Sequence, residues 1–449
     1  MTTADIITWS GGVCPSHLEP REITGVSTDT RTLQPGNFFI ALKGERFDGH
    51  DFIPQAIEKG VRGVLTSRRV DLPQGICLVQ VDDTTEALKK IANRYRHKIS
   101  AQVIAIVGSN GKTTCKNMLA ALLGKENRVT KTPANNNNKI GVSLTLLSAQ
   151  PVDRFIIVEA GTNSPGELAE LCRIIEPDHG LITNINAEHL EGFGNLEGVF
   201  QEESEILRHL SKKSYVSLPG DDQHYLALLQ MASCQTVSAG FNPSSDLRIT
   251  DWHAQSSRQS FRLHDKHTAH SATVQLPLPG RHMALNAALC LALACRLGMD
   301  LQKAAYALES FRPEKGRLNI LKSNGKTIID DTYNANPSAM FSALDVLENM
   351  PGKKMAILGD MAELGPRSAE LHKNVADHIQ QKNIDSVVGV GVLAANYSQC
   401  GKPFHHFETT QQAITAIPAI VRDIDTVLVK GSRFMRMELI VKAITECLC

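Results

Sequence analysis

The segment VIAIVGSNGKTT at residues 103–114 constrains the fold of this chain more than any other. Its apolar, β-branched run stops at a glycine, and a helical pattern of apolar residues follows, so it predicts a buried strand, a tight loop and a helix. Loops of this kind point backbone N–H groups at an anion, and the adjoining helix N-terminus adds its positive dipole. We therefore predict a phosphate-binding loop composed of Gly108, Ser109, Asn110, Gly111, Lys112, Thr113 and Thr114.

Two side chains of this loop suit a nucleotide. Lys112 would neutralise the β- and γ-phosphates, and the Thr113 hydroxyl would ligate Mg²⁺. The general P-loop has a glycine where this chain has Ile106, so the loop is a shortened GxxGKT form. The alternative is a glycine turn that carries a lysine by chance, which the strand before it and the helix after it disfavour.

The pattern of strand, glycine turn and helix repeats along the chain and predicts an α/β fold built of βαβ units. At about 150 residues per domain, 449 residues predict about three domains. We expect a smaller α/β N-terminal domain at 1–98, a central P-loop-type parallel sheet with helices on both faces at 99–310, and a Rossmann-like C-terminal domain at 311–449.

Two stretches depart from the simple alternation. The N-terminal domain begins with turn signals and short apolar runs, and EALKKIANRYRHK predicts the helix that ends it. Residues 246–280 alternate apolar and polar positions around a polar tip. This period of two predicts antiparallel hairpin strands within the central domain.

Composition excludes several classes of function. Forty-seven basic residues balance forty-seven acidic ones and no basic tract occurs, so we expect no nucleic-acid partner. No apolar run approaches about 18 residues, so we expect no membrane span, and the N-terminus lacks the basic region of a signal peptide. Ten cysteines are scattered without a CxxC pair, as is typical of free thiols, so we expect a cytoplasmic protein.

Two further residues lie where ligands gather in open α/β sheets, beyond the carboxyl ends of strands. Glu159 ends the apolar strand of RFIIVEAG, a place where an acid commonly holds the Mg²⁺ of a bound nucleotide. His189 lies in the loop that follows the apolar run GLIT. The alternatives are a strand-end acid that faces water and a solvated loop histidine.

Taken together, these motifs resemble the Mur ligase family. GSNGKTT resembles the family's ATP loop, and NNNNKIGVS, with Asn137 and Asn138, resembles its substrate loop. VEAG and NINAEHLEGFG resemble its two Mg²⁺ segments. PGRHMALNAALC, with Asn286, resembles the helix that contacts adenine, and EKGRLNIL carries Arg317 in a turn similar to the family's Gly-Arg turn. The resemblance covers nearly the whole chain, with the motifs in the family's order.

Within the family, three segments resemble the member that acts last on the peptide: DDTYNANPSAM, ILGDMAELG and VLVKGSRFMRME. The N-terminal STDTRTLQPGNFFIALKGERFDGHDF is similar to that member's UDP-sugar domain. The sibling that adds the third residue, a diamino acid, usually carries a DNPR segment, which this chain lacks. That sibling activity stays open as an alternative, as does a nucleotide-binding module without ligase chemistry.

The resemblance implies a specific reaction. ATP phosphorylates the terminal carboxylate of UDP-N-acetylmuramoyl-tripeptide, and the amine of D-alanyl-D-alanine attacks the acyl phosphate to give an amide, ADP and phosphate. Catalysis then rests on Lys112, Glu159, His189 and Arg317, with Mg²⁺ held by Thr113, Glu159 and His189. The enzyme is expected to be a monomer.

The resemblance also implies binding roles for three groups of residues. The nucleotide would be clamped by Asn286, Asp331, Tyr333 and Asn334. Contacts to the dipeptide or to phosphate would come from Lys430 and Arg433, for which the alternative is a solvated basic loop. The uridine diphosphate end would be held by Ser27, Asp29 and Arg31, for which the alternative is an exposed polar turn.

One departure from the family falls at Glu203, where the family usually has a carbamylated lysine that ligates a second Mg²⁺. The spacing of Val199, Glu203, Ile206 and Leu210 predicts that all four share one face of a helix. Either the Glu203 head group reaches water from the edge of this apolar stripe, or it serves the second Mg²⁺. Because glutamate is roughly 3–4 Å shorter than the modified lysine, the second interpretation needs a bridging water.

Overall fold

The structure is a computed structural model and describes residues 1–15, 19–323 and 325–446. The chain divides into two compact units. The first contains Met1–Ala105, Glu126–Gly161 and Leu168–His179, and the second contains Ile106–Lys125, Thr162–Glu167 and the chain from Gly180 onward. Because these units follow compactness rather than sequence order, the three domain boundaries expected from the sequence stay a prediction.

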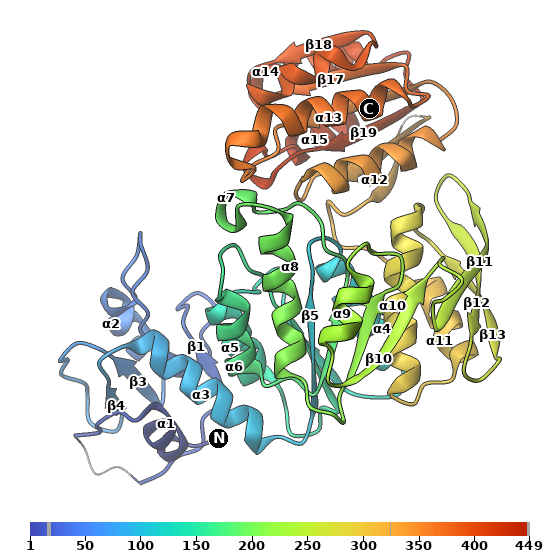
Figure 1. The fold of residues 1–449 in the computed structure, drawn as a ribbon. Coiled ribbons are helices and arrows are strands. Elements are labelled where there is room, and N and C mark those ends of the chain that lie inside the picture. The colour runs from blue at the N-terminus through green and yellow to red at the C-terminus, as the bar shows by residue number, and fades with distance from the viewer. Residues whose placement is uncertain (16–18, 324, 447–449) are drawn as a thin grey trace. The chain divides into compact units, whose positions relative to one another are not determined.

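The N-terminal part of the first unit is a four-stranded parallel sheet (Figure 1). Its strands follow the order β1 (Val26–Ser27), β2 (Phe38–Ile40), β3 (Gly63–Thr66) and β4 (Cys77–Gln80). Its helices are α1 (Thr3–Ser10), α2 (Ile53–Glu58) and α3 (Thr84–Lys98). Phe39, Val64 and Ala56 belong to its apolar core.

Helix α1 differs from the sequence expectation of turns and short strands at the start of the chain. The Thr2 hydroxyl accepts from the backbone N–H of Asp5, and the Asp5 carboxylate accepts from the N–H of Thr2. This reciprocal capping box satisfies two donors at the helix N-terminus. The left-handed Gly11, at φ 69°, ends the helix.

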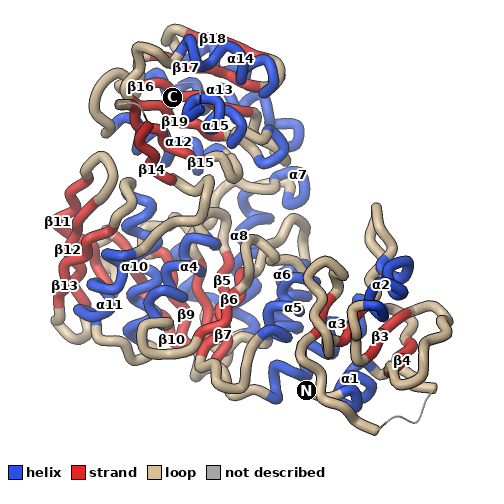
Figure 2. The backbone as a smooth tube through the Cα atoms, turned by 180° about the vertical axis from the view of Figure 1, so that it is seen from behind, coloured by secondary structure: helices blue, strands red, loops and turns tan. Residues whose placement is uncertain are grey.

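A nine-stranded sheet follows the order β13-β12-β11-β10-β9-β8-β5-β7-β6. Its strands are β5 (Gln102–Val107), β6 (Val129–Lys131), β7 (Phe155–Glu159), β8 (His179–Ile182), β9 (Tyr215–Pro219), β10 (Gln235–Gly240), β11 (Leu247–Ala254), β12 (Gln259–Asp265) and β13 (Ser271–Leu276). Strands β8 to β11 run parallel, whereas β11, β12 and β13 are antiparallel, which confirms the hairpins predicted for 246–280 (Figure 2).

The helices that accompany these strands are α4 (Lys112–Leu123), α5 (Lys139–Ser148), α6 (Glu167–Ile175), α7 (Leu190–Phe193), α8 (Leu196–Ser204), α9 (Tyr225–Met231), α10 (Arg281–Arg296) and α11 (Leu301–Ala307). Helix α10 packs against α4, β9 and β10. It is buried over most of its length, as its run of alanine, leucine and cysteine predicts.

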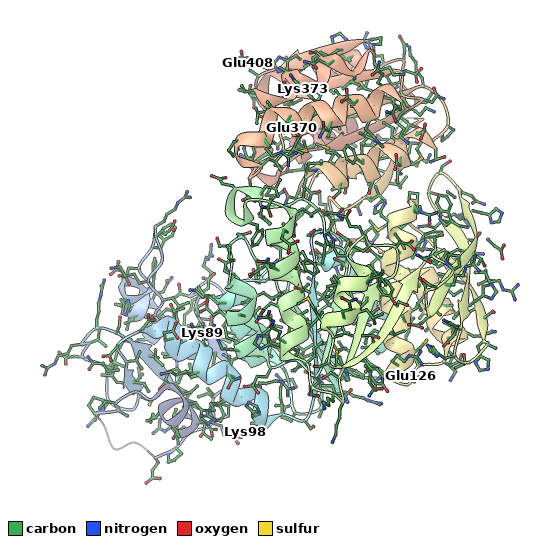
Figure 3. The ribbon with its side chains drawn as sticks, in the orientation of Figure 1. Lys89, Lys98, Glu126, Glu370, Lys373 and Glu408 are labelled. Atoms are coloured by element: carbon green, nitrogen blue, oxygen red, sulfur yellow. The ribbon has the colours of Figure 1, made fainter. Side chains whose placement is uncertain are left out.

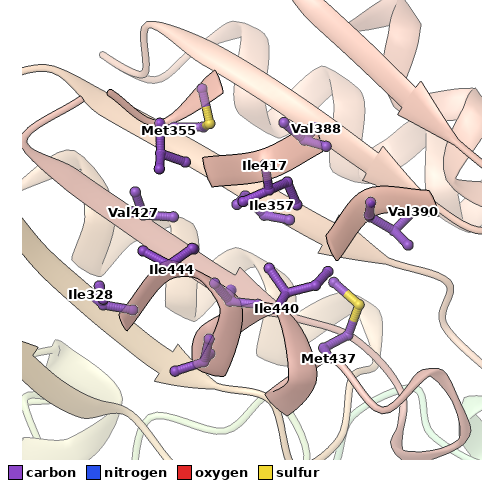
Figure 4. Close-up of a cluster of buried hydrophobic side chains, with 14 of the residues drawn as sticks. Ile328, Met355, Ile357, Val388, Val390, Ile417, Val427, Met437, Ile440 and Ile444 are labelled. Carbon is purple, nitrogen blue, oxygen red and sulfur yellow. The ribbon is translucent and has the colours of Figure 1, made fainter. Parts of the chain in front are cut away.

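The C-terminal part of the second unit is a six-stranded sheet of order β14-β15-β19-β16-β17-β18. Its elements are β14 (Asn319–Ser323), β15 (Lys326–Asp331), α12 (Pro337–Glu348), β16 (Lys354–Gly359), α13 (Ser368–Gln380), β17 (Ser386–Val390), β18 (Phe404–Phe407), α14 (Thr410–Ile420), β19 (Thr426–Lys430) and α15 (Glu438–Glu446). All neighbours are parallel except β14 and β15. Ile357 and Val427 on the sheet pack with Ile417 of α14 and Ile440 of α15 (Figure 4).

The α/β class expected from the sequence is confirmed, with three sheets of mostly parallel strands. No helix in the described part of the chain is long and apolar enough to cross a bilayer. The eight cysteines that the structure describes are free thiols. Strand β5 ends where the predicted phosphate loop begins, so the fold delivers that loop to the carboxyl edge of the nine-stranded sheet.

Candidate functional site

The predicted phosphate loop joins β5 to α4, and two of its glycines are required by its geometry. Gly108 and Gly111 lie at φ 116° and 86°, a region that L side chains rarely adopt. A Cβ atom on Gly108 would lie 2.3 Å from the hydroxyl of Thr183, and one on Gly111 would lie 2.7 Å from the Asn286 amide nitrogen. The Asn286 side chain of α10 therefore packs directly against the loop, while Thr114 is buried in the first turn of α4.

The first three backbone donors of the loop are bound within the protein. The N–H of Gly108 donates to Glu203, the N–H of Ser109 donates to the Asn184 carbonyl, and the N–H of Asn110 donates to the Asn184 side chain. Asn184, which sequence reasoning missed, also donates to the carbonyl of Asn110 at 2.8 Å. These contacts fix the loop against the segment that follows β8. The backbone N–H groups of Gly108, Ser109 and Asn110, which the sequence predicted to face an anion, are thus used within the protein.

Lys112 lies at the start of α4 and bends back over the loop. Its ammonium donates to the carbonyls of Gly108 and Ser109 at 2.5 and 3.2 Å and lies 3.5 Å from the Glu188 carboxylate. Burial raises the pKa of Glu188 to about 8, although Lys112 opposes the shift, and Glu203 adds to it. Glu188 was not identified from the sequence, because its only signal was a charged residue beside His189.

The Glu203 carboxylate lies inside the protein, with an exposed fraction of 1%. Its Oε2 atom accepts a hydrogen bond of 2.6 Å from the Gly108 N–H, and burial raises its pKa. The alternative in which its head group reaches water is therefore wrong, since the phosphate loop supplies the hydrogen bond that a buried carboxylate requires. Helix α8 ends at Ser204 and a 3₁₀ helix, η2 (Glu205–His209), continues it.

The four residues predicted to share one helix face do not lie on one helix: Val199 and Glu203 belong to α8, Ile206 to η2, and Leu210 is the extended residue that ends η2. Val199, Ile206 and Leu210 are all buried together with Glu203.

Residues of the third sheet's connections reach the phosphate loop. The Asn110 side chain donates to the Ser338 hydroxyl at 2.9 Å and accepts from the Asn336 amide at 2.8 Å. Arg317 donates to the Thr113 hydroxyl at 2.8 Å, and its guanidinium stacks over the Tyr333 ring at 3.9 Å. The structure thus brings Arg317, Tyr333 and Thr113 together.

Asp331, Asn334 and Lys430 are hydrogen-bonded to one another at the ends of β15 and β19, where Lys430 is buried, Asp331 is half-buried and Asn334 is exposed. The Lys430 ammonium donates to the Asp331 carboxylate at 2.6 Å and to the Asn334 carbonyl at 2.9 Å, and its exposed fraction is 3%. A solvated loop is therefore the wrong interpretation for Lys430, because it is the last residue of a strand flanked by β15 and β16. Arg433 lies beyond the strand, is mostly exposed and pairs with Glu438.

His189 precedes the short helix α7 and has a left-handed backbone, with φ at 46°. Its Nδ1 atom faces the Glu363 carboxylate at ion-pair distance. Burial lowers the pKa of His189, an effect that Glu363 opposes and Lys112 reinforces. Glu363, in the loop after β16, was also missed by sequence reasoning, because no local pattern links it to a residue so distant in the chain.

In the first unit, Glu159 ends β7 and is buried, with an exposed fraction of 2%. The Asn137 amide donates to the Glu159 carboxylate at 3.0 Å, so these two predicted residues lie together. Asn138 instead caps α5, where its side chain accepts from the N–H of Gly141 at 2.9 Å. The predicted substrate loop is thus fixed at one end by a helix cap and at the other by an acid.

Ser27 is the last residue of β1, and Asp29 and Arg31 lie in the turn that follows it. The Ser27 hydroxyl donates to the Asp29 carbonyl at 3.0 Å, and the guanidinium of Arg31 pairs with the Asp29 carboxylate at 2.7 Å. Hydrogen bonds from Arg31 lower the pKa of Asp29. Arg31 is highly exposed, so this ion pair presents a charged, polar turn to solvent.

A cavity of about 400 Å³ lies between the N-terminus of α10 and helix α12. His282, Trp252, Arg281, Asp345 and Lys382 are among the residues that line it. Burial lowers the pKa of His282 to about 4, whereas Asp331 and Asp345 raise it and Lys430 lowers it further. The imidazole at this cavity is therefore neutral at physiological pH.

Three family models match the chain. They are the Mur ligase family catalytic domain at residues 22–96, the Mur ligase middle domain at 106–294 and the Mur ligase glutamate ligase domain at 316–433. Together they cover most of the sequence, in the order in which the motifs occur.

Full-length relatives share this similarity. The chain is 37% identical to UDP-N-acetylmuramoyl-tripeptide–D-alanyl-D-alanine ligase of Escherichia coli (strain K12), over 96% of each chain. It is 36% identical to the ligase of the same name from Bacillus subtilis (strain 168), over 97% of this chain and 96% of the relative.

Solved structures agree with these relatives. A crystal structure of MurF from Acinetobacter baumannii superposes with a TM-score of 0.93 at 31% identity, covering 99% of this chain and 98% of that one. MurF ligase from Thermotoga maritima in complex with ADP superposes with a TM-score of 0.85 at 28% identity, covering 94% and 97%.

Proposed function

Because the chain belongs to the Mur ligase family, we propose that it adds D-alanyl-D-alanine to UDP-N-acetylmuramoyl-tripeptide with consumption of ATP. The products are UDP-N-acetylmuramoyl-pentapeptide, ADP and phosphate, so the reaction completes the peptide of a peptidoglycan precursor. The observation that carries this proposal is a glycine-bounded phosphate loop with Lys112, in a chain that matches two ligases of this name over nearly its full length.

The ATP site in this proposal is built around α4. The triphosphate lies against the first turn of the helix, where backbone donors and the helix dipole favour negative charge. Lys112 turns from the loop carbonyls to the β- and γ-phosphates. Asn286, Asp331, Tyr333 and Asn334 hold the nucleoside side. A relative from Thermotoga maritima is known in complex with ADP.

The donor chemistry of Thr113 and Glu159 fits Mg²⁺, and the family resemblance adds His189 as a nitrogen ligand. This ion prefers oxygen ligands and usually binds through one or two protein groups, several waters and the substrate phosphates. Thr113 offers a hydroxyl, Glu159 a carboxylate and His189 an imidazole. No group of three or more histidine, cysteine or acidic side chains within the described residues is arranged to hold a metal alone. When bound, the ion would neutralise charge on the phosphates.

The reaction itself needs positive charge and positioning more than covalent help from the protein. The substrate carboxylate attacks the γ-phosphorus and ADP leaves, which gives an acyl phosphate. The dipeptide amine then attacks the acyl carbon, and the tetrahedral intermediate collapses with loss of phosphate. Lys112 and Arg317 stabilise the migrating phosphoryl group, and Asn137 and Asn138 orient the muramoyl substrate.

The remaining predicted contacts fall into two groups. Arg433 is exposed and available to the dipeptide carboxylate, whereas Lys430 acts through the Asp331 and Asn334 segment that it holds. Ser27, Asp29 and Arg31 contact the uridine diphosphate end. The second-metal role of Glu203 stays a prediction, as do the cytoplasmic location and the monomeric state.

ADP release by the purified chain tests the proposal. With UDP-N-acetylmuramoyl-tripeptide, ATP and Mg²⁺, we expect ADP and the pentapeptide mass to appear when D-alanyl-D-alanine is added, and not with a free diamino acid. Activity on a UDP-dipeptide with a diamino acid would favour the sibling ligase instead. Absence of ADP release with every acceptor would favour a nucleotide-binding module.

A further inference from the structure

The loop that follows β16 is held in one conformation by side chains from elsewhere in the C-terminal sheet. The Asp360 carboxylate accepts from the N–H of Ala394 at 2.7 Å, and the N–H of Met361 donates to the His372 Nε2 atom at 3.0 Å. The imidazole of His372 is fully buried, so the loop is bound to the interior of its own domain rather than to solvent.

A third contact and a strained backbone complete this arrangement. The N–H of Ala362 donates to the Ser432 hydroxyl at 2.8 Å. The next residue, Glu363, has φ at 61°, a left-handed conformation that is uncommon for residues other than glycine and costs free energy. A conformation of this kind persists only where the surroundings hold it.

Glu363 meets the segment that contains His189. The Glu363 carbonyl accepts from the N–H of Glu191 at 3.1 Å, and its carboxylate lies at ion-pair distance from the His189 Nδ1 atom. His189 is also left-handed, and its ring packs edge-on against Phe193, so both side chains are constrained toward each other.

The Nδ1 atom of His189 is buried and has no aligned hydrogen bond among the described residues. A buried ring nitrogen needs a partner, and the Glu363 carboxylate supplies an acceptor within reach. Contacts at catalytic groups are often poorly aligned before substrates bind and tighten afterwards. Because Glu363 is about half exposed, with 56% of its side chain accessible, the contact acts on orientation more than on stability.

We propose that Glu363 is a positioning residue for His189: its carboxylate accepts a hydrogen bond from Nδ1–H and so leaves the lone pair on Nε2. The role of Nε2 toward Mg²⁺ or phosphate rests on the proposed function. A carboxylate that fixes the tautomer of a metal-binding histidine raises its basicity as a ligand. Since Glu363 belongs to the C-terminal sheet's loop and His189 to the segment after β8, the histidine is set only while these two parts of the chain are docked.

The contact itself is tested without substrates. Histidine labelled with ¹⁵N in the ring reports which nitrogen is protonated, and a His189→Gln variant assigns the signal. We expect a single Nδ1–H tautomer in the wild-type chain and in Glu363→Gln, whose amide oxygen still accepts, and a mixture in Glu363→Ala. Glu370→Ala is the control, because Glu370 forms an exposed pair with Arg367 on the same part of the chain (Figure 3).

Kinetics test the consequence for the reaction. Removing the hydrogen-bond partner of a metal-ligating histidine typically lowers metal affinity or activity by about ten- to a hundredfold. We therefore expect kcat of Glu363→Ala to fall by that factor, while KM for ATP changes by less than about threefold. Glu363→Gln should recover most of the loss. An unchanged tautomer and an unchanged kcat in Glu363→Ala would overturn the proposal. If the wild-type chain has no ligase activity, the proposed function fails, while the ¹⁵N signal still decides whether Glu363 sets His189.

Discussion

The backbone N–H of Gly108 donates a hydrogen bond of 2.6 Å to the buried carboxylate of Glu203. One residue thus links helix α8 to the first glycine of the phosphate loop. The Glu203 carboxylate therefore stabilises the phosphate loop, whether or not it also supports a metal ion. The structural role and the metal role predict different changes in KM for ATP and in the Mg²⁺ requirement.

We expect Glu203→Ala to lose stability and ATP affinity together. Leaving the Gly108 donor unpaired costs about 1–3 kcal/mol, and a loosened loop should raise KM for ATP more than it raises the half-saturating Mg²⁺ concentration. Glu203→Gln keeps an oxygen acceptor and should stay close to wild type in both measurements. A larger change in the Mg²⁺ requirement than in KM would instead favour the metal role. Activity should need no bicarbonate in any of these proteins.

We expect Lys112→Ala to abolish ligation while the fold is retained. Loss of one charge at the migrating phosphoryl group costs a few kcal/mol in the transition state, or about a hundredfold or more in turnover. Circular dichroism checks the fold, and Lys98→Ala, which removes an exposed ammonium paired with Asp5, serves as the matched control (Figure 3). More than about a tenth of wild-type turnover in Lys112→Ala would contradict the ATP-loop assignment.

The loop around Lys112 could be predicted because its signal is local: an apolar run, two glycines and a helix in twelve residues. Glu188, Asn184 and Glu363 could not, since each acts through a partner that only the folded chain brings near. Lys430 and Arg433 also show that a local sequence pattern does not predict which of two nearby side chains is buried. They are three residues apart, yet the end of a central strand buries the first and leaves the second in solvent.

We expect the Asn110 contacts to govern docking of the C-terminal sheet on the phosphate loop. Asn110→Ala removes its hydrogen bonds to Ser338 and Asn336 and leaves the helix cap of α12 intact, because Asn336 makes that cap with its own oxygen. We expect the C-terminal sheet to close over the site when substrates bind, because closure excludes water from the acyl phosphate. Small-angle scattering of the wild-type chain should therefore show a change in radius of gyration when an ATP analogue and the UDP-substrate bind. The change should be smaller in Asn110→Ala. Identical profiles for free and liganded wild type, with binding confirmed, would count against closure.

The last prediction concerns acid stability and the imidazole of His282. Its pKa is lowered to about 4 in the folded chain, chiefly by burial, from a usual value of 6.5. Between these values the unfolded chain binds more protons, so the free energy of unfolding falls as pH falls from about 6.5 to about 4. A pKa difference of this size changes the free energy of unfolding by at most about 3 kcal/mol, and partial exposure of the ring reduces the change to about 1–2 kcal/mol.

Thermal unfolding midpoints at about pH 7 and about pH 5 measure this contribution. Every variant retains the charged residues around His282. They are Asp331 and Asp345, which raise its pKa, and Lys430, which lowers it. Their own effect on stability is therefore the same in each protein. We expect His282→Asn to lose less stability on acidification than the wild-type chain. His253→Asn is the control and should behave like wild type, because the His253 side chain is exposed on the β11–β12 hairpin. If His282→Asn and wild type lose stability equally, the His282 ring does not stay neutral in the folded chain.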